Sequence, residues 1–199
     1  MPLEAKNIFF RYASGGQWLL NNVSLRAEAG ESVALVGPSG CGKSTLAKIL
    51  SGYIRPDGGT VLWNGKPLPQ SGFCPVQMIH QHPESAVNPR HRMGRILNEG
   101  RARDADLMQA AGIEKEWLSR WPNELSSGEL QRFCIARVLG PKTEFLICDE
   151  IGAMLDVITQ AQIWELVLGA AKRNRLGLIA VTHNRALAER VCDRTITLP

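Results

Sequence analysis

The sequence predicts an α/β fold in which a buried core sheet is joined to an N-terminal antiparallel β subdomain and a small all-helical subdomain. Three observations lead to this prediction. Strand and turn patterns dominate the chain up to residue 65, a helical pattern covers residues 92–121, and fully apolar strand runs alternate with helices after residue 144. The length of 199 residues suits a single domain over residues 1–199, with the helical subdomain at roughly 84–140.

Composition and charge describe an ordinary globular protein. Hydrophobic residues make up 44% of the chain, charged residues 21%, and the formal net charge is +4. Because the lysines and arginines are scattered, we expect no nucleic acid partner. The five cysteines form no C-x-x-C pair, which indicates free thiols in a reducing compartment. The N-terminus lacks the apolar core of a signal peptide, and no apolar run approaches the ~20 residues that span a bilayer.

The N-terminal part is predicted to be rich in strands. Glycine-containing turns at residues 14–16, 29–30 and 56–59 separate the apolar runs. Asn64-Gly65 suits the tight turn of a hairpin. The strands are expected at residues 3–12, 19–26, 31–36 and 60–63.

A glycine-rich loop joins the third of these strands to a helix predicted at residues 44–50. The loop reads Gly37-Pro38-Ser39-Gly40-Cys41-Gly42-Lys43-Ser44-Thr45 and fits G-x-x-x-x-G-K-[ST], which between a strand and a helix predicts a phosphate-binding loop. Its glycines let backbone N–H groups converge on an anion, and the helix N-terminus adds partial positive charge. Lys43 would reach the β- and γ-phosphates and Ser44 would ligate Mg²⁺. The alternative is an ordinary glycine-rich turn, which leaves the Lys-Ser pair in register unexplained.

Two polar side chains elsewhere are further candidates. Tyr12 ends the first strand, upstream of the loop at a distance that would suit an aromatic platform for adenine, or else a plain interface aromatic. Gln81 follows an apolar strand, so its amide oxygen could complete a Mg²⁺ shell and position a water, or simply face solvent. His80 and His82 would share one face of that strand, but with no third ligand evident we predict no histidine metal site.

The helical segment at residues 92–121 is broken into short pieces by Gly100 and Gly112. Its apolar residues are spaced for two helical faces. One face would contain Met93, Ile96 and Leu97, and the other Leu107, Ala110 and Ala111.

Residues 123–132 open an apolar helix. Ser126 and Ser127 are good N-cap residues, and Glu129 falls three residues after Ser126, as in a capping box. A well-capped helix start explains the pattern. A helix start with serine and Gly128 is also an anion site, by the same physics as the first loop.

A fully apolar strand run at residues 145–148 ends in Asp149 and Glu150. Packing alone does not account for two carboxylates at the end of a buried strand, because buried charges need partners. Beside a phosphate loop, Asp149 would hold the magnesium-bound water shell and Glu150 would polarise the attacking water.

The last part of the chain alternates helices and strands. Asp156 is predicted to cap a helix at residues 157–172, whose core face includes Ile163, Leu166 and Val167. A buried strand at residues 177–182 delivers His183 at its C-terminal edge, where ligands bind in open α/β sheets. A short helix and a strand at residues 195–198 follow.

In this order, the motifs resemble those of the ATP-binding subunits of ABC transporters over essentially the whole chain. The resemblance rests on residues 37–45, 79–83, 125–132, 145–150, Asp156 and Thr182-His183. It implies a P-loop NTPase core sheet of the RecA-like type, ATP and Mg²⁺ as cofactors, and ATP hydrolysis at a dimer interface. Tyr12 would stack on adenine, and Gln81 would link the nucleotide to the membrane subunits.

The resemblance also implies that one site is shared by two chains. Ser126 and Gly128 would contact the γ-phosphate of ATP held by the opposite protomer, Asp156 would cross the dimer interface, and His183 would sense the γ-phosphate. The residues expected to do the chemistry in one chain are Lys43, Ser44, Gln81, Asp149, Glu150 and His183.

Within the family, residues 84–90 and 125–137 resemble the peptide and nickel importer branch, above all the second ATPase subunit of a nickel, metallophore or opine importer. This implies a second ATPase subunit, two transmembrane permease subunits and an extracytoplasmic substrate-binding protein as partners, at the cytoplasmic face of the inner membrane. The alternative is a soluble ABC-type ATPase acting in DNA repair or translation. Such proteins usually carry paired ATPase domains or a long coiled-coil insert. A P-loop kinase would leave residues 125–132 unexplained.

The sequence departs from the family pattern at two places. In the usual Leu-Ser-Gly-Gly-Gln, Ser127 replaces the first glycine and Glu129 the glutamine. A carboxylate about 6 Å from a phosphate charge, at an effective dielectric near 20, would cost roughly 2–3 kcal/mol. Either Glu129 turns away as a capping-box residue or this half-site is impaired; because Ser126 and Gly128 are kept, we expect the former. Residues 151–154, Ile-Gly-Ala-Met, replace the usual Pro-Thr-Ser-Ala, so this loop is expected to sit differently.

Overall fold

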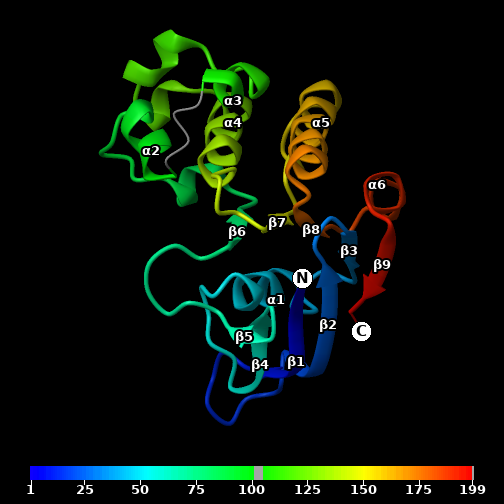
Figure 1. The fold of residues 1–199 in the computed structure, drawn as a ribbon. Coiled ribbons are helices and arrows are strands. Elements are labelled where there is room, and N and C mark those ends of the chain that lie inside the picture. Colours follow the sequence, from blue (N-terminus) through cyan, green and yellow to red (C-terminus); the bar gives the residue numbers. More distant parts are fainter. Residues whose placement is uncertain (101–104, 199) are drawn as a thin grey trace.

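The computed structural model describes residues 1–100 and 105–198 and contains two sheets. One has four strands in the order β2-β1-β4-β5, and the other has five strands in the order β6-β7-β8-β3-β9. The helices between β6 and β7 gather on the opposite side of the five-stranded sheet from the four-stranded sheet (Figure 1). The α/β fold expected from the sequence is confirmed.

The four-stranded sheet is antiparallel and is built around its first strand. Strand β1 (Pro2–Phe10) pairs with β2 (Leu20–Glu28) on one side and β4 (Gly58–Trp63) on the other. A hairpin joins β4 to β5 (Lys66–Pro67), and its turn residues Asn64 and Gly65 have φ angles of 53° and 73°. Two consecutive positive φ angles are those of a type I′ turn, so the predicted hairpin is confirmed.

The five-stranded sheet is parallel and buried. Its neighbours pair in the same direction, so the carboxyl ends of all five strands lie at one edge of the sheet. In strand order this sheet contains β6 (Val76–Ile79), β7 (Phe145–Asp149), β8 (Gly177–Val181), β3 (Ser32–Val36) and β9 (Arg194–Thr197).

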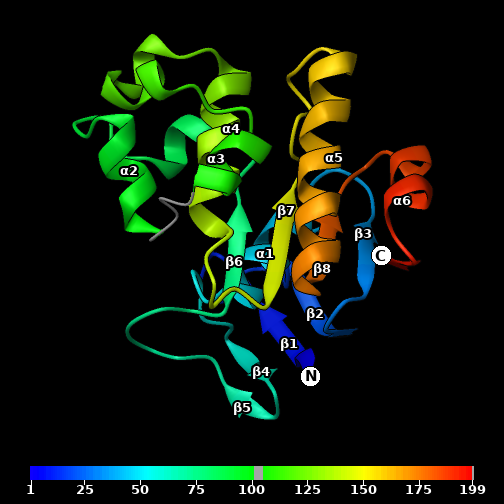
Figure 2. The same ribbon diagram turned by 45° about the horizontal axis from the view of Figure 1, so that its top comes forward.

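Alternate residues of the parallel sheet face two separate cores. Phe145 and Ile147 pack with the antiparallel sheet and α1 (Lys43–Leu50) on one side. Leu146 and Cys148 pack on the other side with α4 (Ser127–Val138) and α5 (Val157–Asn174), which Figure 2 shows side by side over β6 to β8. The sheet is therefore covered on both faces, as its uninterrupted apolar strands require.

The helical segment between β6 and β7 consists of short elements. Its α2 buries Met93, Ile96 and Leu97 completely, as expected. The second predicted face is wrong at Ala110, because α3 buries none of its residues and only the following Ala111 is buried. The elements are η1 (Pro83–Ala86), α2 (Met93–Glu99), α3 (Ala105–Ala110), η2 (Lys115–Ser119) and η3 (Pro122–Glu124), followed by α4.

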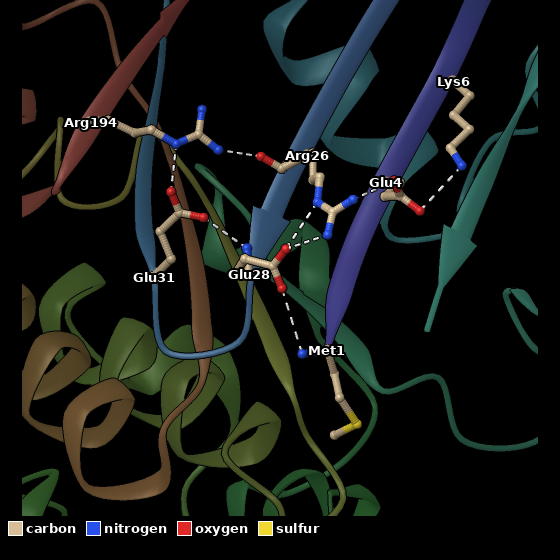
Figure 3. A network of polar contacts seen from close by, with 7 residues as sticks. All are labelled: Met1, Glu4, Lys6, Arg26, Glu28, Glu31 and Arg194. Carbon is tan, nitrogen blue, oxygen red and sulfur yellow. Dashed lines mark hydrogen bonds and ion pairs between the residues drawn. The ribbon is translucent and has the colours of Figure 1, made fainter. Parts of the chain in front are cut away.

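A polar network ties the outer strand of the parallel sheet to the antiparallel sheet (Figure 3). The Arg194 guanidinium, on β9, donates to the Glu31 carboxylate and to the backbone carbonyl of Arg26 on β2. Glu31 also accepts a hydrogen bond of 2.8 Å from the backbone N–H of Glu28. Glu28 in turn pairs with Arg26 and with the N-terminal ammonium. Side chains from β2, the β2–β3 turn and β9 therefore join the two sheets at this edge.

Glu31 makes this network sensitive to pH. The hydrogen bond from Arg194 is the main reason that the pKa of Glu31 lies below its usual value of 4.5, with further help from the Glu28 N–H. A lowered folded-state pKa means that the stabilisation is present at neutral pH and is lost as the pH falls through the folded-state pKa. Glu31→Gln should therefore lower the free energy of unfolding by about 0.5–1 kcal/mol near neutral pH, and by progressively less below about pH 4.

Urea unfolding of wild type and Glu31→Gln, near neutral pH and below about pH 4, measures the difference in the free energy of unfolding. Glu165→Gln, at an exposed position of α5, is the matched control and should change nothing. An equal loss of stability at both pH values would show that the charge of Glu31 is not responsible.

Candidate functional site

The predicted phosphate loop lies at the carboxyl edge of the parallel sheet, between β3 and α1. Gly40 and Gly42 have φ angles of 81° and 99°, which residues with side chains rarely adopt. A Cβ on Gly42 would also lie 2.7 Å from the Leu20 side chain of β2. Within the described residues no side chain caps the N-terminus of α1. Its first backbone N–H groups are thus left for an anion.

Lys43 is buried inside this loop. Its ammonium donates to the carbonyl oxygens of Gly37, at 2.9 Å, and Pro38, at 2.8 Å. These bonds hold the cation over the loop, where it would meet a phosphate.

Ser44 and Asp149 meet across the sheet edge. The Ser44 hydroxyl donates to Asp149 Oδ1 at 2.9 Å, and Asp149 is 5% exposed. Burial raises the pKa of Asp149, and the Ser44 hydrogen bond opposes this shift. A buried carboxylate beside a hydroxyl is an all-oxygen donor set, which suits a hard divalent cation such as Mg²⁺. The residues present therefore fit the expected metal.

Glu150 brings together the segments that follow three neighbouring strands. Its Oε2 accepts a hydrogen bond from Gln81 Nε2 at 3.3 Å, after β6. Its Oε1 lies 3.2 Å from His183 Nδ1, after β8, and accepts from it when that nitrogen carries the proton. The backbone N–H of Glu150 donates to the Val181 carbonyl at 3.0 Å. The predicted residues Gln81, Glu150 and His183 thus form one cluster.

Tyr12 lies beside the start of α1. Its hydroxyl is 3.0 Å from Thr45 Oγ1, and its ring packs edge-on against Phe10, with centroids 5.0 Å apart. The tyrosine is 71% exposed. An exposed ring next to the phosphate loop leaves room for a flat group to stack on it.

Ser126 and Glu129 form the capping box that the sequence predicts. The Ser126 N–H donates to the Glu129 carboxylate at 2.7 Å, and the Ser126 hydroxyl accepts from the Glu129 N–H at 3.3 Å. The carboxylate therefore folds back onto its own helix, which is the first of the two alternatives for Glu129.

Asp156 caps α5, also as predicted. Its Oδ1 accepts from the N–H groups of Ile158 and Thr159, both at 3.0 Å, and its Oδ2 accepts from the Thr159 hydroxyl at 2.6 Å. These hydrogen bonds, led by the one from the hydroxyl, lower the pKa of Asp156. In the part of the chain that the structure describes, no hydrogen bond links Ser126, Gly128 or Asp156 to the phosphate loop.

The two histidines of the Gln81 segment do not share a strand face. Strand β6 ends at Ile79, so the strand alternation expected for His80 and His82 is wrong. The His80 ring packs edge-on against Tyr53, and His82 Nδ1 lies 3.2 Å from Glu84. The chain leaves the sheet before Gln81, which allows that side chain to turn toward Glu150.

One contact at the site has no counterpart among the predicted residues. Gln160, in the first turn of α5, donates from Nε2 to the carbonyl oxygen of Gly152 at 3.1 Å. Gly152 belongs to the loop between Glu150 and Asp156. The sequence offers only a weak signal for this contact, namely a polar residue four positions after a helix cap.

These observations define the class of the protein as a P-loop NTPase: a glycine-rich loop opens a helix, and a carboxylate pair ends a buried strand of the same parallel sheet. Known proteins refine the class. The sequence profile of the ABC transporter family matches residues 20–153, so the chain belongs to the ABC transporter family, as one of its ATP-binding, ATP-hydrolysing subunits. The resemblance inferred from the motifs is confirmed.

Individual relatives are similar over most of their length. The nickel import ATP-binding protein NikE of Rhodospirillum rubrum is 39% identical, over 93% of this chain and 74% of that protein. NikE of Escherichia coli K12 is 35% identical, over 98% of this chain and 83% of that protein.

Solved structures share the fold. The dimeric ATP-binding cassette MJ0796, in a post-hydrolysis state bound to ADP and phosphate, has a TM-score of 0.83 and 24% identity, covering 98% of this chain and 94% of that one. An ATP-binding subunit of an ABC transporter has a TM-score of 0.82 and 25% identity, covering 100% of this chain and 86% of that one. Among the described residues, no helix combines the length and apolar character needed to cross a membrane.

Cys41 gives a direct probe of the loop. Cys41 lies within the loop. Burial makes the other four thiols less reactive, because it raises the pKa of Cys74 and Cys148, of Cys134 to about 11 and of Cys192 to about 12. Because the thiolate is the nucleophile, iodoacetamide near neutral pH should modify Cys41 first. At about ten times its Kd, ATP should slow this modification about tenfold, by occupying the loop.

Peptide mass spectrometry after timed alkylation measures the protection. AMP, which has no β- or γ-phosphate, is the control and should protect weakly. Equal modification of Cys41 with and without ATP would mean that the loop does not cradle the phosphates.

Proposed function

We propose that ATP binds at the loop of residues 37–45 and is hydrolysed beside it. Lys43 supports this because its ammonium already lies over the loop carbonyls, from which a phosphate would take it. The exposed ring of Tyr12 would stack on the adenine. Ser44 and Asp149, together with the side-chain oxygen of Gln81, would hold Mg²⁺, which would neutralise charge on the phosphates.

The observation that carries this proposal is the cluster around Glu150. A carboxylate held by Gln81 on one side and His183 on the other stands beside the Ser44–Asp149 pair. Glu150 would accept the proton of the attacking water, and His183 would sense the γ-phosphate. Gln81 would orient the water and link the bound nucleotide to the membrane subunits.

The proposed working form is a dimer with a second ATPase subunit, identical or homologous. Within the described residues, Ser126 and Gly128 make no hydrogen bond to the phosphate loop of their own chain, so they would contact the γ-phosphate of ATP on the partner. The capping box supports this, because it turns the negative charge of Glu129 back onto α4. Asp156 would cross the dimer interface from the start of α5.

We further propose that the chain powers import. Similarity to the nickel import proteins NikE supports nickel as the cargo. The motifs at residues 84–90 and 125–137 add a metal chelate, an opine or a peptide as alternatives. ATP-driven closure of the dimer would move two transmembrane permease subunits. An extracytoplasmic substrate-binding protein would deliver the cargo to them. The chain would then lie at the cytoplasmic face of the inner membrane, without contact to nucleic acid.

Glu150→Gln tests the catalytic assignment. The amide cannot accept the proton, so turnover should fall at least about 100-fold, while ATP binding through residues 37–45 persists. The variant should accumulate as an ATP-bound dimer because hydrolysis no longer resets it. Phosphate release and analytical ultracentrifugation with ATP measure the two effects, and undiminished hydrolysis would refute the role of Glu150.

Uptake assays in cells test the transport assignment. Cells that lack the chain should take up radioactive nickel several-fold more slowly, and wild type but not Glu150→Gln should restore uptake. The tagged chain should co-purify with membrane proteins. Normal nickel uptake with impaired peptide use would identify a peptide as the cargo. Co-purification of the tagged chain with ribosomes or DNA would favour the soluble alternative.

A further inference from the structure

The loop between Glu150 and Asp156 has a demanding backbone conformation. Glu150 and Gly152 have φ angles of 47° and 72°. Two successive turns follow, in which the Ala153 N–H donates to the Glu150 carbonyl at 3.3 Å and the Leu155 N–H donates to the Gly152 carbonyl at 3.0 Å. A non-glycine residue at positive φ persists only where its surroundings hold it. The Glu150 N–H bond to the Val181 carbonyl holds the strand side of this residue, so a further contact is needed on the loop side.

Gln160 supplies such a contact from α5. Among residues 1–100 and 105–198, its bond to the Gly152 carbonyl is the only side-chain hydrogen bond made to the backbone of residues 151–155. The fit is close, because a Cβ on Gly152 would lie 3.1 Å from Gln160 Cγ. A residue with a side chain at position 152 would therefore crowd Gln160 as well as strain the backbone.

The loop has space into which it could move. A cavity of 200 Å³ lies between the loop, α5 and the segment after β8. Residues from all three sides line it, and the Trp164 indole N–H beside it has no partner within the described chain. The lining includes Glu150, Ala153, Gln160, Trp164 and His183. Packing alone therefore does not fix the loop on this side.

The helix that carries Gln160 is fixed independently of it. Asp156 caps the first turn, and the Gln160 N–H donates to the Asp156 carbonyl at 2.8 Å. Ile163 and Val167 are completely buried in the core below. Removing the Gln160 amide should therefore release the loop and leave α5 in place.

We infer that Gln160 is a positioning residue for hydrolysis: by holding the Gly152 carbonyl, it keeps the Glu150 carboxylate between Gln81 and His183. The inference rests on the proposed role of Glu150. It also assigns a purpose to the unusual loop sequence Ile151-Gly152-Ala153-Met154, because the buried Gly152 provides both the positive φ angle and the space for the Gln160 side chain.

Gln160→Met tests this inference, because methionine has nearly the same shape but cannot donate. Loss of one partly buried hydrogen bond should lower kcat about five- to tenfold. The KM for ATP should stay within about twofold, because residues 37–45 are untouched. Gln160→Glu, whose carboxylate also cannot donate, should show the same split, and it replaces the methionine variant if that one folds poorly.

Asn174→Leu is the matched control, since it removes a similar amide-to-carbonyl hydrogen bond from the far end of α5. Its kcat should be that of wild type. Adding Gln160→Met to Glu150→Gln should cause no further loss of turnover, because Gln160→Met would act only through the Glu150 carboxylate, which is already absent in that background.

The outcomes separate the two proposals. A wild-type kcat in both Gln160 variants, or an equal further loss in the Glu150→Gln background, would overturn the inference about Gln160 alone. Full turnover in Glu150→Gln itself would instead overturn the catalytic assignment on which the inference rests.

Discussion

The hydrogen bond between Ser44 and the buried carboxylate of Asp149 is the contact on which the site depends. It joins the start of α1 to the end of β7, two strands away from β3 in the sheet. Burial raises the pKa of Asp149, so the ionised form needs compensation from nearby donors or a cation. The fold thus places a carboxylate that a cation would stabilise directly beside the loop that would hold the phosphates.

The two sheets contribute to this site in different ways. The parallel sheet brings its carboxyl ends together, so residues after β3, β6, β7 and β8 share one edge. The antiparallel sheet and the segment after β1 support the loop from outside: Leu20 leaves no space for a Cβ on Gly42, and Tyr12, two residues beyond β1, contacts Thr45. Figure 3 shows how Arg194 and Glu31 then join this sheet to the far edge of the parallel one.

The sequence predicts those parts of the site whose pattern is local. Residues 37–45, the Asp149-Glu150 pair and the Ser126–Glu129 capping box are each specified within a few positions, and the structure forms them. Contacts between distant segments carry no such signal. The bond from Gln160 to Gly152 depends on how α5 returns over the loop. That Ala111 is buried and Ala110 is exposed, although the spacing predicts both on the buried face, depends on where α3 ends. The error at His80 and His82 has the same origin, because β6 ends at Ile79, before either histidine, and the strand alternation does not reach them.

The loop from Glu150 to Asp156 links the two halves of the proposed dimer site. Its first residue contacts Gln81 and His183, and its last caps α5 at the position expected to face a partner. Only five residues, 151–155, lie between them, and the Gln160 side chain bonds to one of these. A shift of Asp156 on dimer closure would therefore be passed to the Glu150 carboxylate through the Gln160–Gly152 contact. Hydrolysis would then depend on the partner through a movement of Glu150 as well as through Ser126 and Gly128. The departure of residues 151–154 from the usual Pro-Thr-Ser-Ala therefore falls in the segment that would connect the two halves of the dimer site.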